Sequence, residues 1–484
     1  MKKLFKIIFL MSFVSSLSFA GGAEDAEELL VRLSTERLTV DQMVRLVEND
    51  LASLDLQQRI IYYSRSLKYL QENGLPRKET DALFLRALND LKHVPKNMFS
   101  EKGMCNWGED GALECLSQDT INMAMSNIGM SPSVAQQYVV EYFKMPWLTT
   151  LMVQGVSMSL GQHSSLPYPY MRYMVEQLLK TDFPTPKDYK SAIAFNILRM
   201  IRYSNYSSSS MSGFLSYGFS YEDSLWILKT VLKSGYEKGE TKEGLKYLDT
   251  LFSTGIEFEK KVKALADSKD VQAVASVLQQ MMRQPEIAVP MSEIAFDWLR
   301  KNSISESMRV DIVRTLLSVL KSVNKDEWSI RFRNNSRGAV QVLTDLPLTI
   351  QLPKYAQEEI YRFVIESNLG DSEGAPWGRN RVFTSSIGAK PKTELPGLQM
   401  AMEMLAEVAT AGDSVSGIIG DPELNYSNAG RLVAQIADCE SAKPYAGTNM
   451  KACAGITSKR AILEKIINNS SISSIIKNNA RKLL

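Results

Sequence analysis

LQQRIIYYSRSLKYL, residues 56–70, contains the pattern that decides the fold of this chain. Its apolar side chains recur in steps of four, three, four and three residues, at Leu56, Ile60, Tyr63, Leu67 and Leu70. An α-helix turns once every 3.6 residues, so these side chains share one face and leave the polar ones on the other. The stretch therefore predicts an amphipathic helix that buries one face.

The same periodicity recurs along the chain. Ile193, Ile197 and Ile201 are spaced by four, and residues 310–320 repeat the stripe of three and four. Signals for helix starts precede several of these runs, among them a capping box at 39–42. Alternation of period two, which would predict strands, is confined to short pieces such as 329–333 and 348–352.

We therefore predict an all-α fold of many short antiparallel helices. Expected helix starts near 185, 220 and 255 lie about 35 residues apart, which is close to the period of α-solenoid repeats. The residues themselves do not repeat with that spacing. Two architectures stay open: an irregular α-solenoid of the HEAT or TPR kind, and a non-repeating helical fold.

The composition is that of a folded protein. Of 484 residues, 44% are hydrophobic and 23% are charged, which excludes disordered and collagen-like chains. The formal charge of +2 includes three lysines and no acid in residues 1–20, and without them 53 bases face 54 acids. A chain so close to neutral predicts no nucleic-acid partner.

Residues 1–20 have the layout of a secretory signal peptide. Lys2, Lys3 and Lys6 precede an apolar run over 7–14, and Ser18-Phe-Ala20 supplies small residues for cleavage after Ala20. The apolar run is too short to span a bilayer, so we expect no transmembrane span in the mature chain. We predict that the protein is periplasmic or secreted.

Composition also suggests where domains begin and end. A Ser- and Tyr-rich stretch follows residue 202, and a Gly- and Pro-rich stretch follows residue 370. We predict a signal peptide over 1–20 and helical domains over 21–205, 206–369 and 370–484, the last beginning with the Gly- and Pro-rich loop.

Four cysteines form two local pairs in loop-like stretches: Cys105 with Cys115, and Cys439 with Cys453. An even number in an exported chain favours disulfides, because that compartment is oxidising. Three pairings are open, and we expect the two local ones, since each closes a short loop. We predict two loops stapled by disulfides.

Catalytic motifs are scarce. The chain has two histidines, His93 and His163, and contains neither a Walker A loop nor HExxH, GxGxxG or GxSxG. Neither histidine is near a cysteine pair in the sequence, so we expect no zinc. The sequence predicts no cofactor and no metal.

One series of short motifs suggests an enzyme. The helix IYRFVIES (360–367), the tripeptide GLQ (397–399) and YSNAG (426–430) follow one another in that order. In type and order they resemble the catalytic Glu-Ser helix, the GLMQ and the AYNAG motifs of lytic transglycosylases. The chain departs from that pattern, because GLQ lies 31 residues after Glu366 and an extra residue separates Tyr426 from Asn428.

The resemblance implies a peptidoglycan-cleaving glycosidase. In such an enzyme Glu366 would protonate the glycosidic oxygen as the general acid, and burial would keep it protonated. Gln399 and Asn428 would then lie with Glu366 around one cleft. The ordinary alternative is a solvated carboxylate at the end of a helix.

Two further segments have features of binding surfaces. Tyr168, Tyr170 and Tyr173 cluster near two prolines and would suit a groove for a glycan or an extended peptide, although tyrosines beside prolines at a helix start more often serve ordinary packing. The last thirty residues combine six bases with several isoleucines. This predicts either a peripheral membrane contact through a basic C-terminal helix or a closing helix docked on the fold.

The leading hypothesis is an exported, non-enzymatic helical protein that binds or scaffolds in the bacterial cell envelope. Its partner would be a protein or a cell-wall component. The alternative hypothesis is the glycosidase centred on Glu366. The enzyme question stays open at this level, because active sites built only of carboxylates leave little trace in a single sequence.

Overall fold

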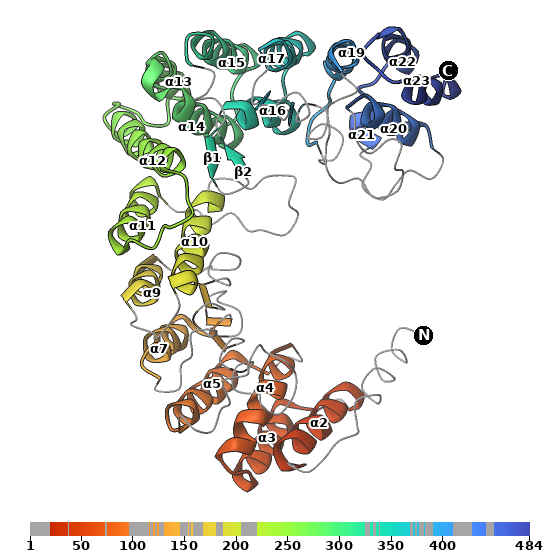
Figure 1. Ribbon diagram of the computed structural model, residues 1–484. Coiled ribbons are helices and arrows are strands. Elements are labelled where there is room, and N and C mark those ends of the chain that lie inside the picture. Colours follow the sequence, from red (N-terminus) through yellow and green to blue (C-terminus); the bar gives the residue numbers. More distant parts are fainter. Residues whose placement is uncertain are drawn as a thin grey trace. The chain divides into compact units, whose positions relative to one another are not determined.

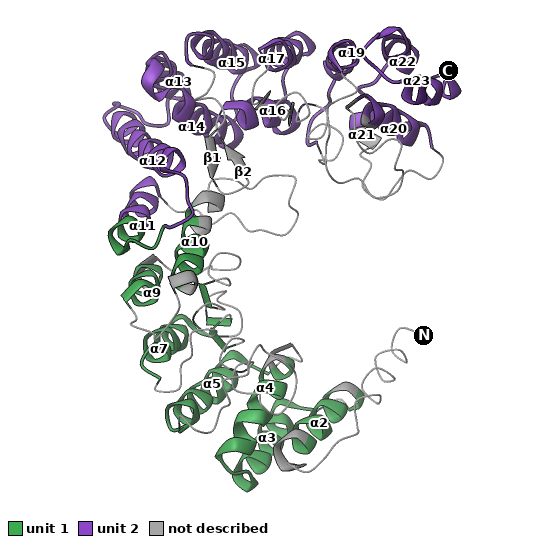
Figure 2. Ribbon diagram, in the orientation of Figure 1, with its two compact units in different colours: residues 1–202, 230–237 green, residues 203–229, 238–484 purple. Residues whose placement is uncertain are grey.

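The structure is a computed structural model, and its described part is all-helical apart from two short β-ladders. It describes residues 20–36, 38–72, 75–95, 116, 120–121, 123–124, 130–145, 153, 156–157, 168–180, 187–204, 220–324, 330–332, 335–337, 339–367, 371–372, 375–376, 382, 391–409, 428–441 and 450–484. The chain divides into two compact units (Figure 2). Unit 1 comprises residues 1–202 and 230–237, and unit 2 comprises 203–229 and 238–484.

Unit 1 is a series of helices, most of which pack against helices near them in the chain. Its helices are α2 (Ala20–Thr35), α3 (Val40–Ser53), α4 (Leu56–Glu72), α5 (Arg77–Lys92), α7 (Pro132–Tyr142), α9 (Tyr168–Lys180) and α10 (Lys187–Ser204). Helix α4 contacts α2 and α5, while α7 contacts α5 and α9. This sequential packing explains why one apolar stripe per helix suffices to form the core.

The sequence signals for these helices are confirmed. The Thr39 hydroxyl accepts from the backbone N–H of Gln42, and the Gln42 side chain accepts from Thr39, so α3 begins with the predicted capping box. In α4, Ile60, Tyr63, Leu67 and Leu70 are all buried. The stripe that predicted this helix is therefore its core-facing side.

Unit 2 contains a longer series of helices. They are α11 (Tyr221–Ser234, in unit 2 as far as residue 229), α12 (Lys242–Lys263), α13 (Val271–Met282), the 3₁₀ helix η3 (Pro285–Ile287), α14 (Ala288–Lys301), α15 (Glu306–Leu320), α16 (Ala339–Thr349), α17 (Lys354–Glu366), α19 (Leu398–Val408), α20 (Asn428–Glu440), α21 (Met450–Cys453), α22 (Lys459–Asn468) and α23 (Ser474–Lys482).

Helices of unit 2 lie in two rows (Figure 1). Helices α13, α15, α17, α19 and α22 contact one another in that order, and α12, α14 and α16 form the second row. Contacts between α12 and α13, α14 and α15, and α16 and α17 join the rows. Each helix in the two rows thus packs against near neighbours along the chain.

The first row contains parallel helices. Gln399, at the start of α19, exchanges hydrogen bonds with the backbone of Ser458, the N-cap of α22. Past the end of α22, the Asn469 amide donates to the carbonyls of Ala406, Glu407 and Ala409 at the end of α19. Because start meets start and end meets end, α19 and α22 run in the same direction.

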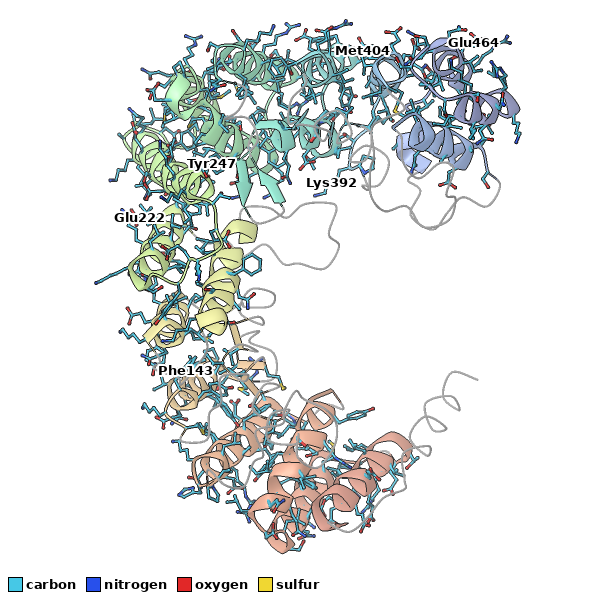
Figure 3. The ribbon with its side chains drawn as sticks, viewed as in Figure 1. Phe143, Glu222, Tyr247, Lys392, Met404 and Glu464 are labelled. Carbon is cyan, nitrogen blue, oxygen red and sulfur yellow. A yellow bond between two sulfur atoms is a disulfide. The ribbon has the colours of Figure 1, made fainter. Side chains whose placement is uncertain are left out.

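A short segment, residues 391–397, connects α16, α17 and α19. The backbone N–H of Lys392 (labelled in Figure 3) donates to the carbonyl of Leu348 in the last turn of α16. Carbonyls in the last turn of a helix have no partner within the helix, and the segment satisfies one of them. The start of α19 is thereby fixed beside α16 and α17.

The β-structure is minor. Strands β1 (Ile330–Phe332) and β2 (Asn335–Arg337) pair antiparallel, as do β3 (Asp371–Ser372) and β4 (Ala375–Pro376). Of the alternating residues 329–333, the described ones, 330–332, form β1, whereas strand character over 348–352 is wrong, because α16 continues through Thr349. The apolar residues there, Leu348, Ile350 and Leu352, are buried at a helix end and in a linker instead.

Among the helices that the structure describes, none has the length and apolar character needed to span a bilayer.

Candidate functional site

The candidate site is a surface hollow between α13 and α15, in the first row of unit 2. Both helices begin at capped residues: Asp270 accepts from two backbone N–H groups of α13, and Ser305 accepts from Met308 in α15. Their apolar stripes, which include Leu278 and Leu316, face the core. Their polar side chains are consequently left along the surface between the two helices.

This hollow, which we call the α13–α15 hollow, has a volume of about 460 Å³ and is open to solvent. Its lining is formed by Gln279, Arg283, Asp311, Arg314, Thr315, Ser318 and Val319. Six of these seven side chains are polar or charged. A cavity of this size holds a few residues of an extended peptide or a small organic molecule.

Hydrogen-bond donors dominate the hollow. Arg283 is the C-cap residue of α13, its side chain is exposed, and it forms no ion pair with any acidic side chain that the structure describes. Gln279 and Ser318 add an amide and a hydroxyl, while the Thr315 hydroxyl already donates to the backbone carbonyl of Asp311 at 2.8 Å. Asp311 is the single carboxylate of the lining. The arrangement suits a ligand that presents carbonyl or carboxylate oxygens.

The far wall of the hollow is held by an ion pair between α15 and α17. Arg314 donates from Nε and Nη2 to the two carboxylate oxygens of Glu359, at 2.9 and 2.5 Å. Hydrogen bonding by Arg314 lowers the pKa of Glu359, and the same bond raises the pKa of Arg314. The guanidinium also lies 5.3 Å from the ring centroid of Tyr355. Arg314 is therefore oriented before any ligand arrives.

Glu366, the candidate general acid, lies at the last position of α17 with 58% of its side chain exposed. Its partner is Arg362, one turn earlier, at 3.4 Å. The Arg362 guanidinium also lies 4.0 Å from the Met400 sulfur of α19. A general acid of this class depends on partial burial, and Glu366 is in solvent beside a guanidinium.

The other two residues of the transglycosylase-like motifs have different surroundings. The Gln399 amide bonds to the Ser458 backbone and to the Glu403 carboxylate, so its hydrogen bonds join α19 to α22. Asn428 is the first residue of α20, and its side chain lies outside the described part of the chain. The structure gives no contact that joins Glu366 to Gln399.

Of the three tyrosines, Tyr173 is described with its side chain. Its hydroxyl donates to the carbonyl of Val140 at 3.3 Å, and its ring meets that of Phe143 edge to face. Both contacts join α9 to α7, and Phe143 is labelled in Figure 3. The side chains of Tyr168 and Tyr170, in the first turn of α9, lie outside the described residues.

The cysteine prediction is confirmed for one pair. Cys439, near the end of α20, and Cys453, at the end of α21, form a disulfide with a Cα–Cα distance of 5.6 Å. Cys105 and Cys115 both lie outside the described residues, so the first staple stays a prediction. Within the part of the chain that is described, no group of three His, Cys, Asp or Glu side chains is arranged to hold a metal ion.

Sequence reasoning missed the α13–α15 hollow. Arg283, Arg314 and Thr315 belong to ordinary polar helix faces, and no local spacing separates them from any other solvated face. The hollow exists because the polar faces of α13 and α15 lie close together. That closeness depends on how the two helices pack, which the sequence does not show. A scan against protein-family models and a search of curated proteins both find no match for the chain.

Proposed function

We propose that the protein is an exported helical binding or scaffolding protein of the bacterial cell envelope, and that it binds a segment of a partner protein in the α13–α15 hollow. The observation that carries this proposal is the exposed, donor-rich lining of the hollow around Arg283. Export is supported by the signal-peptide layout of residues 1–20.

The packing of unit 2 supports an irregular α-solenoid. Its two rows of helices, with contacts mainly between near neighbours, are the arrangement by which stacked helical hairpins build extended surfaces. Such surfaces commonly act as binding platforms. The hollow lies between two adjacent members of one row, α13 and α15, where a ligand would contact both.

The chemistry of the hollow favours an extended peptide segment carrying a carboxylate. Arg283 would pair with the carboxylate, because its charge has no acidic partner in the described part of the chain. Gln279 and Ser318 would bond to backbone carbonyls of the segment. Arg314 and Glu359 neutralise one another and would serve as a rigid wall.

A site-specific crosslinking experiment tests the proposal. A photoreactive residue replaces Ser318 in the hollow, and in a second strain it replaces Ser253, an exposed residue of α12 outside the hollow. We expect a discrete crosslinked product from position 318 in envelope preparations and none from 253. The product should disappear with Arg283→Glu and persist with Lys269→Glu, a charge reversal elsewhere on the surface. A product that survives Arg283→Glu contradicts the proposal.

The glycosidase alternative is tested separately. The purified chain is incubated with peptidoglycan, and soluble muropeptides are measured for the wild-type chain and for Glu366→Gln. The exposure of Glu366 leads us to expect no release from either. Release that vanishes in Glu366→Gln would establish the enzyme and overturn the binding proposal.

A further inference from the structure

Helix α23 is attached to the fold by one face only. Its N-cap Ser473 accepts from the backbone N–H of Ile476, and its buried side chains are Ile476 and Ala480. Helix α23 packs against α22 and α20, as the C-terminal helices of Figure 1 show. Residues four apart share one face of a helix, so the positions roughly opposite are free to face solvent.

The outward side carries both apolar and basic groups. Ile475 is 48% exposed and Leu484, two residues past the helix, is 57% exposed. Between them Arg481 and Lys482 are exposed, and Lys477 is half-buried. An exposed isoleucine alone is ordinary, but here apolar and cationic side chains share one short helix.

The positive charge of this segment is not compensated. After Glu464 the side chains include four bases, Lys465, Lys477, Arg481 and Lys482, and no Asp or Glu. Lys465 pairs with Glu403 and Glu407 of α19. By contrast, the hydrogen bonds of Arg481 and Lys482 go to the neutral side chains of Asn478 and Asn479.

The basic side chains just before this segment, in contrast, form ion pairs with acidic side chains. Lys459 pairs with Glu440 at 3.1 Å, and Arg460 pairs with Glu464 at 2.7 Å. Glu464 is labelled in Figure 3. The imbalance of charge therefore begins with α23, where Arg481 and Lys482 are exposed and Lys477 is half-buried.

We propose that the outer side of α23 docks on an anionic phospholipid surface. A polyanionic headgroup layer complements the positive charges of Lys477, Arg481 and Lys482, because basic side chains near an anionic leaflet are attracted to it. Ile475 and Leu484 enter the boundary between headgroups and acyl chains. The buried face keeps α23 attached to α22, so the helix carries the rest of unit 2 with it. This inference does not depend on the α13–α15 hollow.

Vesicle flotation of the full chain tests the inference. The probe vesicles contain phosphatidylethanolamine with phosphatidylglycerol, and phosphatidylcholine vesicles are the neutral comparison. We expect binding to the anionic vesicles only, with release in about 1 M salt, where the Debye length is about 3 Å. The double reversal Arg481→Glu/Lys482→Glu should lower the partition coefficient by roughly tenfold or more.

Matched controls separate docking from loss of fold. Lys78→Glu/Lys269→Glu makes the same change in net charge at exposed positions elsewhere and should bind like the wild-type chain. Ile475→Ser/Leu484→Ser leaves the charge intact and should weaken binding severalfold. The inference is overturned if the chain binds neither vesicle, binds both equally, or binds a soluble polyanion such as heparin but not vesicles. Circular dichroism confirms that each variant is folded.

Discussion

Gln357 shows how much of unit 2 depends on a single side chain. It is completely buried in α17, where its amide nitrogen donates to the carbonyls of Leu352 and Glu394. Its amide oxygen accepts from the backbone N–H of Gly397, the N-cap residue of α19. A Cβ at Gly397 would lie less than 3.0 Å from the Cβ of Gln357, so glycine allows this close approach.

We expect Gln357→Leu to destabilise unit 2 by about 2–4 kcal/mol. Leucine fills the space but leaves two carbonyls and one N–H without partners, and each buried unpaired group costs about 1–3 kcal/mol before relaxation. The free energy of unfolding comes from denaturant titration, with hydrogen exchange in α19 as the local readout. Gln280→Leu, on an exposed face of α13, should change stability by less than about 0.5 kcal/mol. A loss below 1 kcal/mol at Gln357 would refute the prediction.

Asp50 predicts a dependence of stability on pH. Burial raises its pKa above the ordinary 3.8, and this effect outweighs the hydrogen bond from the Tyr62 hydroxyl, which lowers it. An acid whose pKa is raised by folding destabilises the fold above that pKa and stops doing so below 3.8. Asp50→Asn should therefore stabilise unit 1 at pH 7, and the gain should shrink as the pH falls toward 3.8.

Thermal unfolding of wild-type and Asp50→Asn chains across this pH range measures the effect. The amide oxygen of asparagine can still accept from Tyr62, so the change isolates the charge. Glu48→Gln, at an exposed site of the same helix, is the control. A gain from Asp50→Asn that is constant with pH would show that the charge of Asp50 is not its cause.

At the scale of elements, Gly255 allows the ring of Tyr221, the first residue of α11, to pack against the backbone of α12. A Cβ at this position would lie less than 3.0 Å from the Tyr221 ring. We expect Gly255→Ala to destabilise unit 2 by about 1–2 kcal/mol, because overpacking outweighs the better helix propensity of alanine. In a Tyr221→Ala background the same substitution should become neutral or stabilising. Denaturant titration of the four chains gives this double-mutant cycle, and an unchanged sign would contradict the proposed clash.

The disulfide fixes α21 to the end of α20. Cys439 and Cys453 are separated by 14 residues, and closing a loop of about that length restricts the unfolded chain by about 3 kcal/mol. We expect Cys439→Ser/Cys453→Ser to lose about 2–3 kcal/mol, and dithiothreitol to produce the same loss in the wild-type chain. Peptide mapping without reduction should show the 439–453 linkage and a 105–115 linkage. A 105–439 linkage would refute the local pairing.

At the scale of the whole molecule, the helices could be predicted from the sequence, but only some of the contacts between them could. The periodicity of residues 56–70 and the capping box at Thr39 are local, so they are readable without knowing the rest of the fold. The contacts of Gln357 with Glu394 and Gly397, and those of Asn469 with the end of α19, join residues 37 to 63 positions apart. Glutamine and asparagine are polar everywhere, and nothing in their local sequence marks one as buried.

The candidate site was unpredictable for a related reason. Arg283 and Ser318 line one hollow because α13 and α15 lie side by side in one row, and that arrangement depends on how the second row packs against them. Short motifs in the sequence indicated Glu366 as a candidate catalytic residue. In the structure, however, its carboxylate is exposed to solvent. Short motifs indicate chemistry only when the fold buries and groups their residues.

The proposed export of the protein concerns the whole chain and has its own test. We expect the protein recovered from bacterial envelope fractions to begin at Gly21, because the small residues Ser18 and Ala20 suit a cleavage after Ala20. N-terminal sequencing or intact mass measures this directly. Replacing Ala20 with a bulky residue such as phenylalanine should leave an uncleaved precursor. A mature protein that retains residues 1–20 would refute the prediction.

The parallel attachment of α22 to α19 also has a mechanical consequence. Force applied at residue 484 would reach α23 and α22 first, and the hydrogen bonds of Asn469 and Gln399 lie at opposite ends of the α19–α22 contact. A force that pulls one of two parallel helices along its axis loads their contact in shear. The hydrogen bonds of Gln399 and those of Asn469 would then resist the separation of α19 and α22 at the same time. The C-terminal helices should therefore yield under tension in one abrupt step, while α19 and α17 remain folded.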